Sequence, residues 1–167
     1  MPTSEPSPPT PDNILNEDLT DNRTADTLGA GIPRLATKTL TFTGAANLGE
    51  VNTSATLFTV TGEVLIVYIS VICTVDLTGA TSTVSLGVTG DTDLFIAATT
   101  ATTIDAGTFW QTTTPKANGV ALAATCKDIV ITDDILIESL TFGTTGGALR
   151  LDVFWLPLSS DAVLVAA

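Results

Sequence analysis

The sequence predicts an all-β protein, an antiparallel sandwich or jelly roll that follows an extended N-terminal segment. Three observations predict it. Short apolar stretches alternate with threonine, turns rich in Gly, Asp, Asn and Pro separate these stretches, and β-branched residues dominate the longest apolar run. No long amphipathic pattern separates the predicted strands, so nothing indicates the helices of a parallel α/β sheet. The 167 residues, 44% of them hydrophobic, suffice for one domain with a sizeable core.

The first 36 residues differ in composition from the rest. They open with "MPTSEPSPPTPDN", which is rich in Pro and Ser and cannot pack a core. The spacing of Leu15 and Leu19 allows a short helix between them, and "GAGIPR" predicts a hinge. We therefore expect an arm at 1–36 and a β-domain at 37–167.

Two interpretations of this arm stay open: a tail without a role, and an arm that orders on a neighbouring molecule. In the second case it would extend over neighbouring subunits of an assembly or adjacent copies of the chain. The residues expected to make contact are then apolar or basic: Ile14, Leu15, Leu19, Arg23, Leu28 and Arg34.

Beyond the arm, about eight to ten short strands are predicted from alternating or continuous apolar stretches bounded by turn residues. In the stretch 81–90, Val84, Leu86 and Val88 are expected to point inward, with small or polar residues between them. In chain order, the predicted strands lie within 37–44, 54–62, 63–75, 81–90, 92–99, 108–112, 119–125, 127–132, 135–143 and 147–159.

The longest apolar run lies within "GEVLIVYISVICTVD". It extends over about a dozen residues, whereas a membrane-spanning helix needs about 20. Its many Val and Ile residues favour a strand, and apolar residues on both alternating faces require cover by a second sheet or another subunit. We expect an interface between copies to include Val64, Ile66, Tyr68 and Trp155.

Charge and composition exclude several classes of function. A net charge of −12 and a pI near 4.1 oppose binding to nucleic acid. The chain contains no histidine, which removes His-based acid–base catalysis, the Ser-His-Asp triad and the commonest zinc ligand. Because no secretory signal opens the chain, we expect Cys73 and Cys126 to be buried thiols rather than a disulfide.

No motif predicts catalysis. Carboxylates recur at 90–93, at 132–134 and at Asp105, but acids are common in turns, and a calcium loop converges six to eight oxygen ligands. There is no phosphate loop, dinucleotide fingerprint or nucleophile elbow. We expect no enzyme activity, no cofactor and no metal site.

The stretch "DLTGATSTVSLGVTGDTDLFIAATTATTIDAGTFW", followed later by "DVFWLPLSSDAVLV", resembles small β-rich structural proteins of tailed bacteriophages. The resemblance extends over residues 55–165. It implies a virion protein made in the host cytoplasm, foremost a capsid decoration (cement) protein that sits as a trimer on the outer shell. Its partners would be copies of itself and the major capsid protein, with no nucleic acid and no membrane.

Two alternatives stay open. One is another virion component, such as a head fibre base, a neck protein or a tail protein. The other is a carbohydrate-binding module or β-sandwich glycosidase, with Trp110 as a stacking platform and Asp91, Asp93 or Asp105 as ligands.

Overall fold

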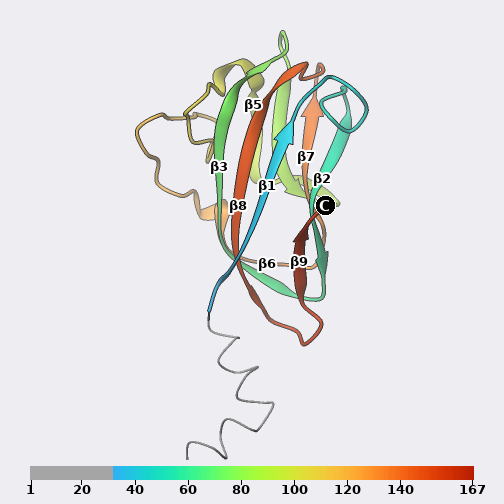
Figure 1. Cartoon of the computed structure of the whole chain (residues 1–167), viewed down its shortest axis with the longest axis vertical. Coiled ribbons are helices and arrows are strands. Elements are labelled where there is room, and N and C mark those ends of the chain that lie inside the picture. Colours follow the sequence, from blue (N-terminus) through green and yellow to red (C-terminus); the bar gives the residue numbers. More distant parts are fainter. Residues whose placement is uncertain (1–31) are drawn as a thin grey trace, which may run out of the picture. The chain divides into compact units, whose positions relative to one another are not determined.

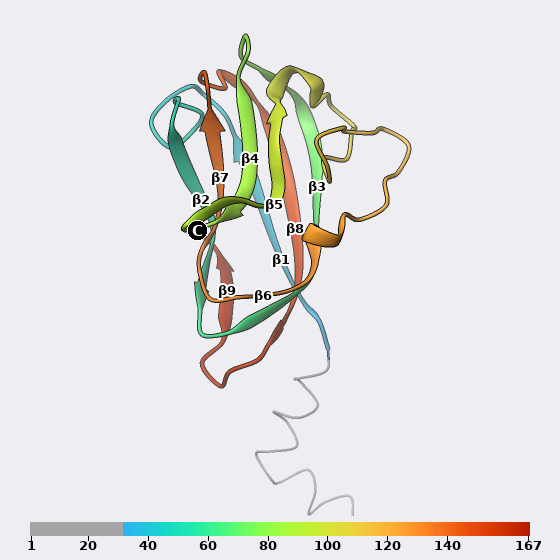
Figure 2. The same ribbon diagram turned by 180° about the vertical axis from the view of Figure 1, so that it is seen from behind.

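The computed structural model describes residues 32–167, and they form two antiparallel β-sheets packed face to face (Figures 1 and 2). The predicted sandwich is confirmed. The strands are β1 Arg34–Thr41, β2 Thr53–Thr61, β3 Val64–Thr78, β4 Thr83–Val88, β5 Asp91–Thr100, β6 Lys127–Ile131, β7 Ile135–Leu140, β8 Gly146–Pro157 and β9 Val163–Ala166. One sheet has the order β1-β8-β3-β6 and the other β5-β4-β7-β2-β9.

The pairing of the strands is nested. β1 pairs with β8, β2 with β7, β3 with β6 and β4 with β5, all antiparallel. This is the jelly-roll arrangement, in which one long hairpin is rolled so that its strands divide between two sheets. β9 extends the five-stranded sheet by pairing with β2.

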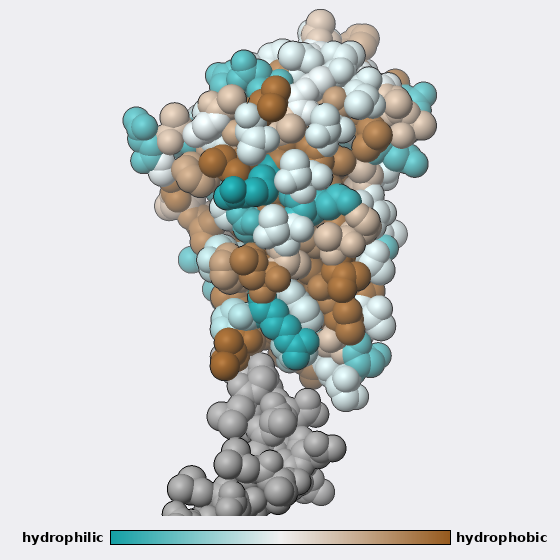
Figure 3. Space-filling model, in the orientation of Figure 1, coloured by the Kyte–Doolittle hydropathy of each residue, from teal (hydrophilic) through white to brown (hydrophobic). Residues whose placement is uncertain are grey.

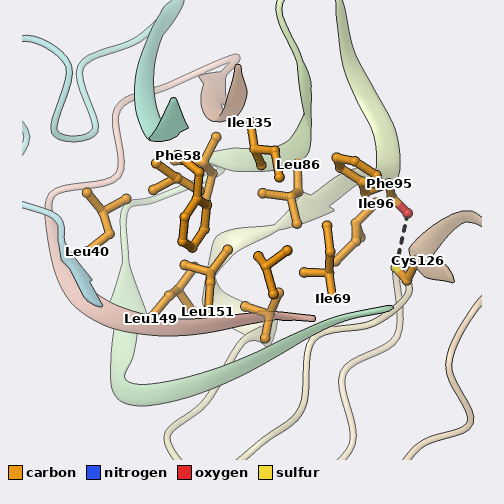
Figure 4. Packing of buried hydrophobic residues seen from close by; sticks show 14 of the residues in the cluster. Leu40, Phe58, Ile69, Leu86, Phe95, Ile96, Cys126, Ile135, Leu149 and Leu151 are labelled. Carbon is orange, nitrogen blue, oxygen red and sulfur yellow. Dashed lines mark hydrogen bonds between the residues drawn. The ribbon is translucent and has the colours of Figure 1, made fainter. Parts of the chain in front are cut away.

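The core lies between the sheets, and both contribute large apolar side chains to it (Figure 4). β1 and most of β8 supply alternate residues to it, so in these strands the inner face is apolar and the outer face more polar. Full burial of one such side chain contributes about 1.5–3 kcal/mol. Labelled in Figure 4 are Leu40, Ile69, Leu149 and Leu151 from the four-stranded sheet, and Phe58, Leu86, Phe95, Ile96 and Ile135 from the five-stranded sheet.

Several predicted boundaries are wrong. The first strand begins at Arg34 instead of Thr37, so three residues assigned to the arm belong to the β-domain. The stretch 119–125 forms no strand, and β9 was not predicted. β4 does not alternate as expected, because its small residues Ser85 and Gly87 are buried as well. The predicted helix at Leu15–Leu19 lies outside the described residues.

The connection 101–126 joins β5 in one sheet to β6 in the other and contains two short 3-10 helices, η1 Ala101–Thr103 and η2 Ala124–Cys126. The strand predicted at 108–112 is reduced here to isolated bridges at Phe109. β6 pairs only with the start of β3, and the connection covers β3 further along. The N–H of Trp110 donates to the carbonyl of Val71 (2.9 Å), and the N–H of Cys73 donates to the carbonyl of Thr108 (2.9 Å). This connection therefore satisfies backbone groups that an open sheet edge would expose.

Candidate interaction surface

The outer face of the four-stranded sheet carries two adjacent rows of apolar side chains. In one row Leu35, Phe154 and Tyr68 lie next to one another on β1, β8 and β3. In the other, Leu156, Leu65 and Val130 do so on β8, β3 and β6. We call these six residues the apolar rows. They occupy the end of the sheet where β1 begins.

The apolar rows are accessible to a partner. Leu35 is 57% exposed and Val130 is 55% exposed, and the other four members are half-buried. The rings of Tyr68 and Phe154 stack with centroids 4.3 Å apart and planes inclined by 22°. Such a stacked pair is a rigid apolar surface whose side chains have little further entropy to lose on binding.

The rest of this face is polar. Beyond the apolar rows, Arg150 and Asp152 form an ion pair (3.1 Å), and the Thr37 hydroxyl donates to Asp152 (2.8 Å). Figure 3, in the orientation of Figure 1, shows hydrophobic groups on the lower half of this side of the molecule, below a hydrophilic band. The face thus divides into an apolar half and a charged half.

Basic residues concentrate on this sheet. Of the six Lys and Arg residues in the chain, four lie in its strands: Arg34, Lys38, Lys127 and Arg150. The strands of the five-stranded sheet contain no Lys or Arg and three acids: Asp91, Asp93 and Glu138. The strands of the four-stranded sheet also contain three acids, Asp76, Asp128 and Asp152, against the four bases, so their formal charges sum to +1, compared with −3 for the strands of the other sheet. The bases on the outer face are Lys127 and Arg150, because Arg34 and Lys38 pair with the inward-facing Trp155 and Leu151.

Three of the four residues predicted for an interface between copies lie in the core of the sandwich and not on this outer face. Val64 and Ile66 are fully buried and Trp155 is 4% exposed, all within the chain's own core. They have no surface to offer a second copy. Only Tyr68 lies on the outer face.

A β-bulge explains the separation of Tyr68 from its predicted neighbours. Ile66 pairs with Trp155 and Tyr68 pairs with Phe154, so Val67 is an extra residue on β3. The bulge shifts the alternation by one residue, which places Tyr68 outward and Ile69 inward. The sequence did contain a signal for Phe154 and Leu156, since they alternate with the buried Val153 and Trp155.

Of the predicted arm contacts, only Arg34 lies within the described residues. It is part of β1, and its guanidinium lies 5.2 Å from the centroid of the Trp155 ring, a cation–π distance. The other five, Ile14, Leu15, Leu19, Arg23 and Leu28, lie outside the described residues.

Trp110 does not form the platform that the carbohydrate-binding alternative requires. Its side chain is fully buried, and its indole N–H donates to the Thr99 hydroxyl (3.0 Å). A sugar-stacking ring must present one face to solvent. A shallow pocket of about 160 Å³ nearby, lined in part by Phe109 and Gln111, is smaller than the 300–1,000 Å³ typical of ligand sites.

Two carboxylates, Asp134 in the turn before β7 and Asp76 on β3, accept hydrogen bonds from backbone N–H groups. Asp134 accepts from the N–H of Val60 (2.8 Å), and Asp76 accepts from the N–H of Ala106 (2.7 Å). Within residues 32–167, no three Cys, Asp or Glu side chains gather as metal ligands would.

Both cysteines are free and buried, as predicted. Desolvation raises the pKa of the Cys126 thiol to about 11 and also raises the pKa of Cys73. A thiol held in its neutral form is a poor nucleophile, so these side chains serve as core residues.

No protein-family model, no curated protein and no solved structure matches the chain. The resemblance to phage structural proteins therefore stays a prediction. Within the part of the chain that the structure describes, neither helix has the length and hydrophobicity needed to cross a membrane.

Proposed function

We propose that the protein is a structural component of a bacteriophage virion, a capsid decoration protein that associates with copies of itself and with the major capsid protein. The observation that carries the proposal is the set of apolar rows, which lie outside a core that is already complete. Contiguous exposed apolar side chains are typical of surfaces that bind another protein, and this supports the proposal.

The apolar rows have the make-up of an interface centre. Aromatic residues are enriched at the centres of interfaces, and a rim of charged groups surrounds them. Here the Tyr68–Phe154 stack takes the central position, and Arg150 and Lys127 lie at the border. A trimer at a threefold capsid position would repeat this contact in a closed ring.

The fold is compatible with this role without deciding it. Jelly rolls form viral capsid domains and also lectin domains. The burial of Trp110 weighs against the carbohydrate-binding alternative, because the ring has no free face. A neck, tail or head fibre position would use the same surface, so copy number separates these alternatives.

The test combines copy number with binding. Mass spectrometry of purified virions should give hundreds of copies per particle for a decoration protein and a handful for a neck or tail component. Phe154→Ser should weaken binding to capsids that lack the protein by roughly thirtyfold, the effect of losing about 2 kcal/mol at an interface centre. Val165→Ser on β9, whose side chain is 51% exposed on the other sheet, is the matched control and should bind normally.

Both variants are first compared by thermal unfolding to show that they fold. Cross-linking on the capsid then reports whether the bound copies form trimers. Absence of the chain from virions, or capsid binding by Phe154→Ser equal to that of the control, would contradict the proposal.

A further inference from the structure

We propose that copies of the chain join through two unlike surfaces, the apolar rows of one copy and the loop end of the next. The loop end consists of the connection 42–52 between β1 and β2 and the turn 141–145 between β7 and β8. The inference rests on the proposed function in so far as the apolar rows are the surface that binds a second copy. It goes further by identifying which surface of that copy they bind.

The loop end carries exposed apolar side chains of its own. Phe142 is 56% exposed, Val51 is 39% exposed and Leu48 is 37% exposed. The two loops touch, since a Cβ at Gly143 would lie 2.9 Å from the carbonyl oxygen of Gly49 and 3.7 Å from the backbone nitrogen of Val51. We call Leu48, Val51 and Phe142 the loop patch.

Hydrogen bonds hold the loops of this patch in one conformation. The N–H of Leu48 donates to the carbonyl of Ala45 (2.9 Å), and the N–H of Thr43 donates to the carbonyl of Leu48 (2.9 Å). Between the two loops, the N–H of Thr144 donates to the carbonyl of Gly49 (2.7 Å). A surface that is already ordered loses little entropy when it binds, which favours its use as an interface.

The loop patch and the apolar rows lie at opposite ends of the sandwich. The apolar rows occupy the end where β1 begins, whereas the connection 42–52 follows the end of β1 (Figure 1). β1 has 8 residues, whose rise of about 3.3 Å each separates its two ends by roughly 23 Å. One chain cannot bring its own two surfaces together, so each surface is available to a different copy.

Charge favours the loop end as the surface that approaches another copy. Copies of a chain with a net charge of −12 repel one another. Residues 39–62 contain one charged residue, Glu50, and residues 139–149 contain none. The loop end is therefore a part of the surface where this repulsion is weak.

The charges beside the apolar rows point the same way. Lys127 lies next to Tyr68 there, and two acids, Asp128 and Glu63, lie nearby. Two copies of the apolar rows placed face to face would bring four acids and two bases together. The loop end adds only Glu50, for which Lys127 is an oppositely charged neighbour.

The size of the apolar rows also favours a contact between unlike surfaces. They extend over about 14 Å across four strands and about 7 Å along them. Such a patch is well below the roughly 800 Å² per partner of a standard interface, so a single contact is weak and copies stay separate in dilute solution.

A ring compensates for this weakness. A contact between like surfaces joins two copies and stops, whereas a contact between unlike surfaces adds a copy at each step and can close into a ring. Every copy in a ring uses both its apolar surfaces, and the last contact forms at a high effective concentration. The trimer of the proposed function is one such ring.

Two variants that each disable one surface provide the test. Phe154→Ser alters the apolar rows and Phe142→Ser alters the loop patch, and each alone should weaken self-association in light scattering by about thirtyfold. In an equal mixture, the intact apolar rows of the Phe142→Ser chain should bind the intact loop patch of the Phe154→Ser chain. The product is a pair that cannot grow. Val165→Ser on β9, 51% exposed on the other sheet, is the control and should associate like the unchanged chain.

NMR identifies the surfaces that meet in the mixture. With the isotope label in the Phe154→Ser chain, the Phe142→Ser chain should shift the methyl signals of the loop patch. With the label in the Phe142→Ser chain, the signals of the apolar rows should shift instead. The methyl signals of Val165 should stay in place in both experiments.

Thermal unfolding first shows that the variants fold, and Val51→Ser replaces Phe142→Ser if the latter does not. Self-association of either surface variant equal to that of the control would overturn the proposal. So would a mixture without these shifts, or an unchanged chain that stays monomeric at about 1 mM, where a contact worth about 4 kcal/mol would be half occupied. These measurements use no capsids, so their failure is distinguishable from a failure of the proposed virion function.

Discussion

Trp110 provides the sharpest test of how the long connection 101–126 is held to the sandwich. Its indole fills a site between β3 and β5 and is fully buried. Its N–H bonds to the Thr99 hydroxyl (3.0 Å), and its backbone N–H bonds to Val71 (2.9 Å). If this side chain anchors the connection, its removal affects the free energy of unfolding more than that of an exposed aromatic residue.

The expected magnitudes follow from burial and hydrogen bonding. Trp110→Ala should lower the free energy of unfolding by about 3–5 kcal/mol, through lost burial and the cavity left behind. Thr99→Val keeps the shape of the side chain but leaves the buried indole N–H without its acceptor, at a cost of about 1–3 kcal/mol. Because most domains are stable by only about 5–15 kcal/mol, Trp110→Ala removes a large part of the total.

Urea unfolding measures both effects. The two single variants and the double variant form a cycle, and the residues in contact should be coupled, so that the double variant is less destabilised than the sum. Phe142→Ala, an aromatic residue that is 56% exposed, is the control. A Trp110→Ala cost below that of Phe142→Ala, or strictly additive effects of Thr99→Val and Trp110→Ala, would refute the anchoring role.

Three further predictions concern particular contacts of the described residues. A Cβ at Gly87 would lie 2.1 Å from the carbonyl oxygen of Asp91, so Gly87→Ala should destabilise toward the upper end of about 1–3 kcal/mol. At Gly90 a Cβ would meet nothing within 4 Å, but φ is +92°, so Gly90→Ala should lower the free energy of unfolding by only about 1–2 kcal/mol. Equal losses of stability in the Gly87 and Gly90 variants would contradict the predicted clash at Gly87. Thr144→Val should lower the free energy of unfolding by about 1–3 kcal/mol, because the buried hydroxyls of Ser82 and Ser139 lose their hydrogen bonds to the Thr144 hydroxyl (2.7 and 3.3 Å). The exposed control Thr59→Val should change the free energy of unfolding little in the same urea assay. The folded protein keeps the thiol of Cys126 protonated up to its raised pKa of about 11, while the unfolded chain loses that proton above the ordinary pKa of 9.0. The free energy of unfolding should therefore fall as the pH rises from 9.0 to about 11. Cys126→Ala should flatten that decline in unfolding curves measured across this range, and an unchanged slope would contradict the assignment.

The sequence predicts the sandwich because alternation records which residues face the core. In β1, Leu40 is buried between the exposed Thr39 and Thr41, as a half-buried strand requires. In β2, Leu57 and Val60 are both buried because a register shift between Thr56 and Phe58 interrupts the alternation. The connection 101–126 is harder to predict, since it runs from one sheet to the other and its Phe109 makes only isolated bridges. Such pairing depends on tertiary contacts that local sequence does not encode.

The residues predicted for an interface between copies divide between the core and the outer face for a related reason. A run that is apolar on both faces does not reveal which face belongs to the core. The bulge at Val67 also breaks the alternation that would have grouped Tyr68 with Val64 and Ile66. A one-residue irregularity therefore decides which side chains are available to a partner.

Charge then distinguishes the two outer faces that the fold leaves available. An acidic chain gains solubility from acids spread over its whole surface. Here four of six basic residues lie in the strands of the one sheet that also carries the apolar rows, and none lies in the strands of the other. The same sheet also holds Asp76, Asp128 and Asp152, so the formal charges of its strands sum to +1, while those of the five-stranded sheet sum to −3. If the protein assembles as proposed, we expect the four-stranded sheet, with the apolar rows, to face its partners and the five-stranded sheet, with Asp91, Asp93 and Glu138, to face solvent.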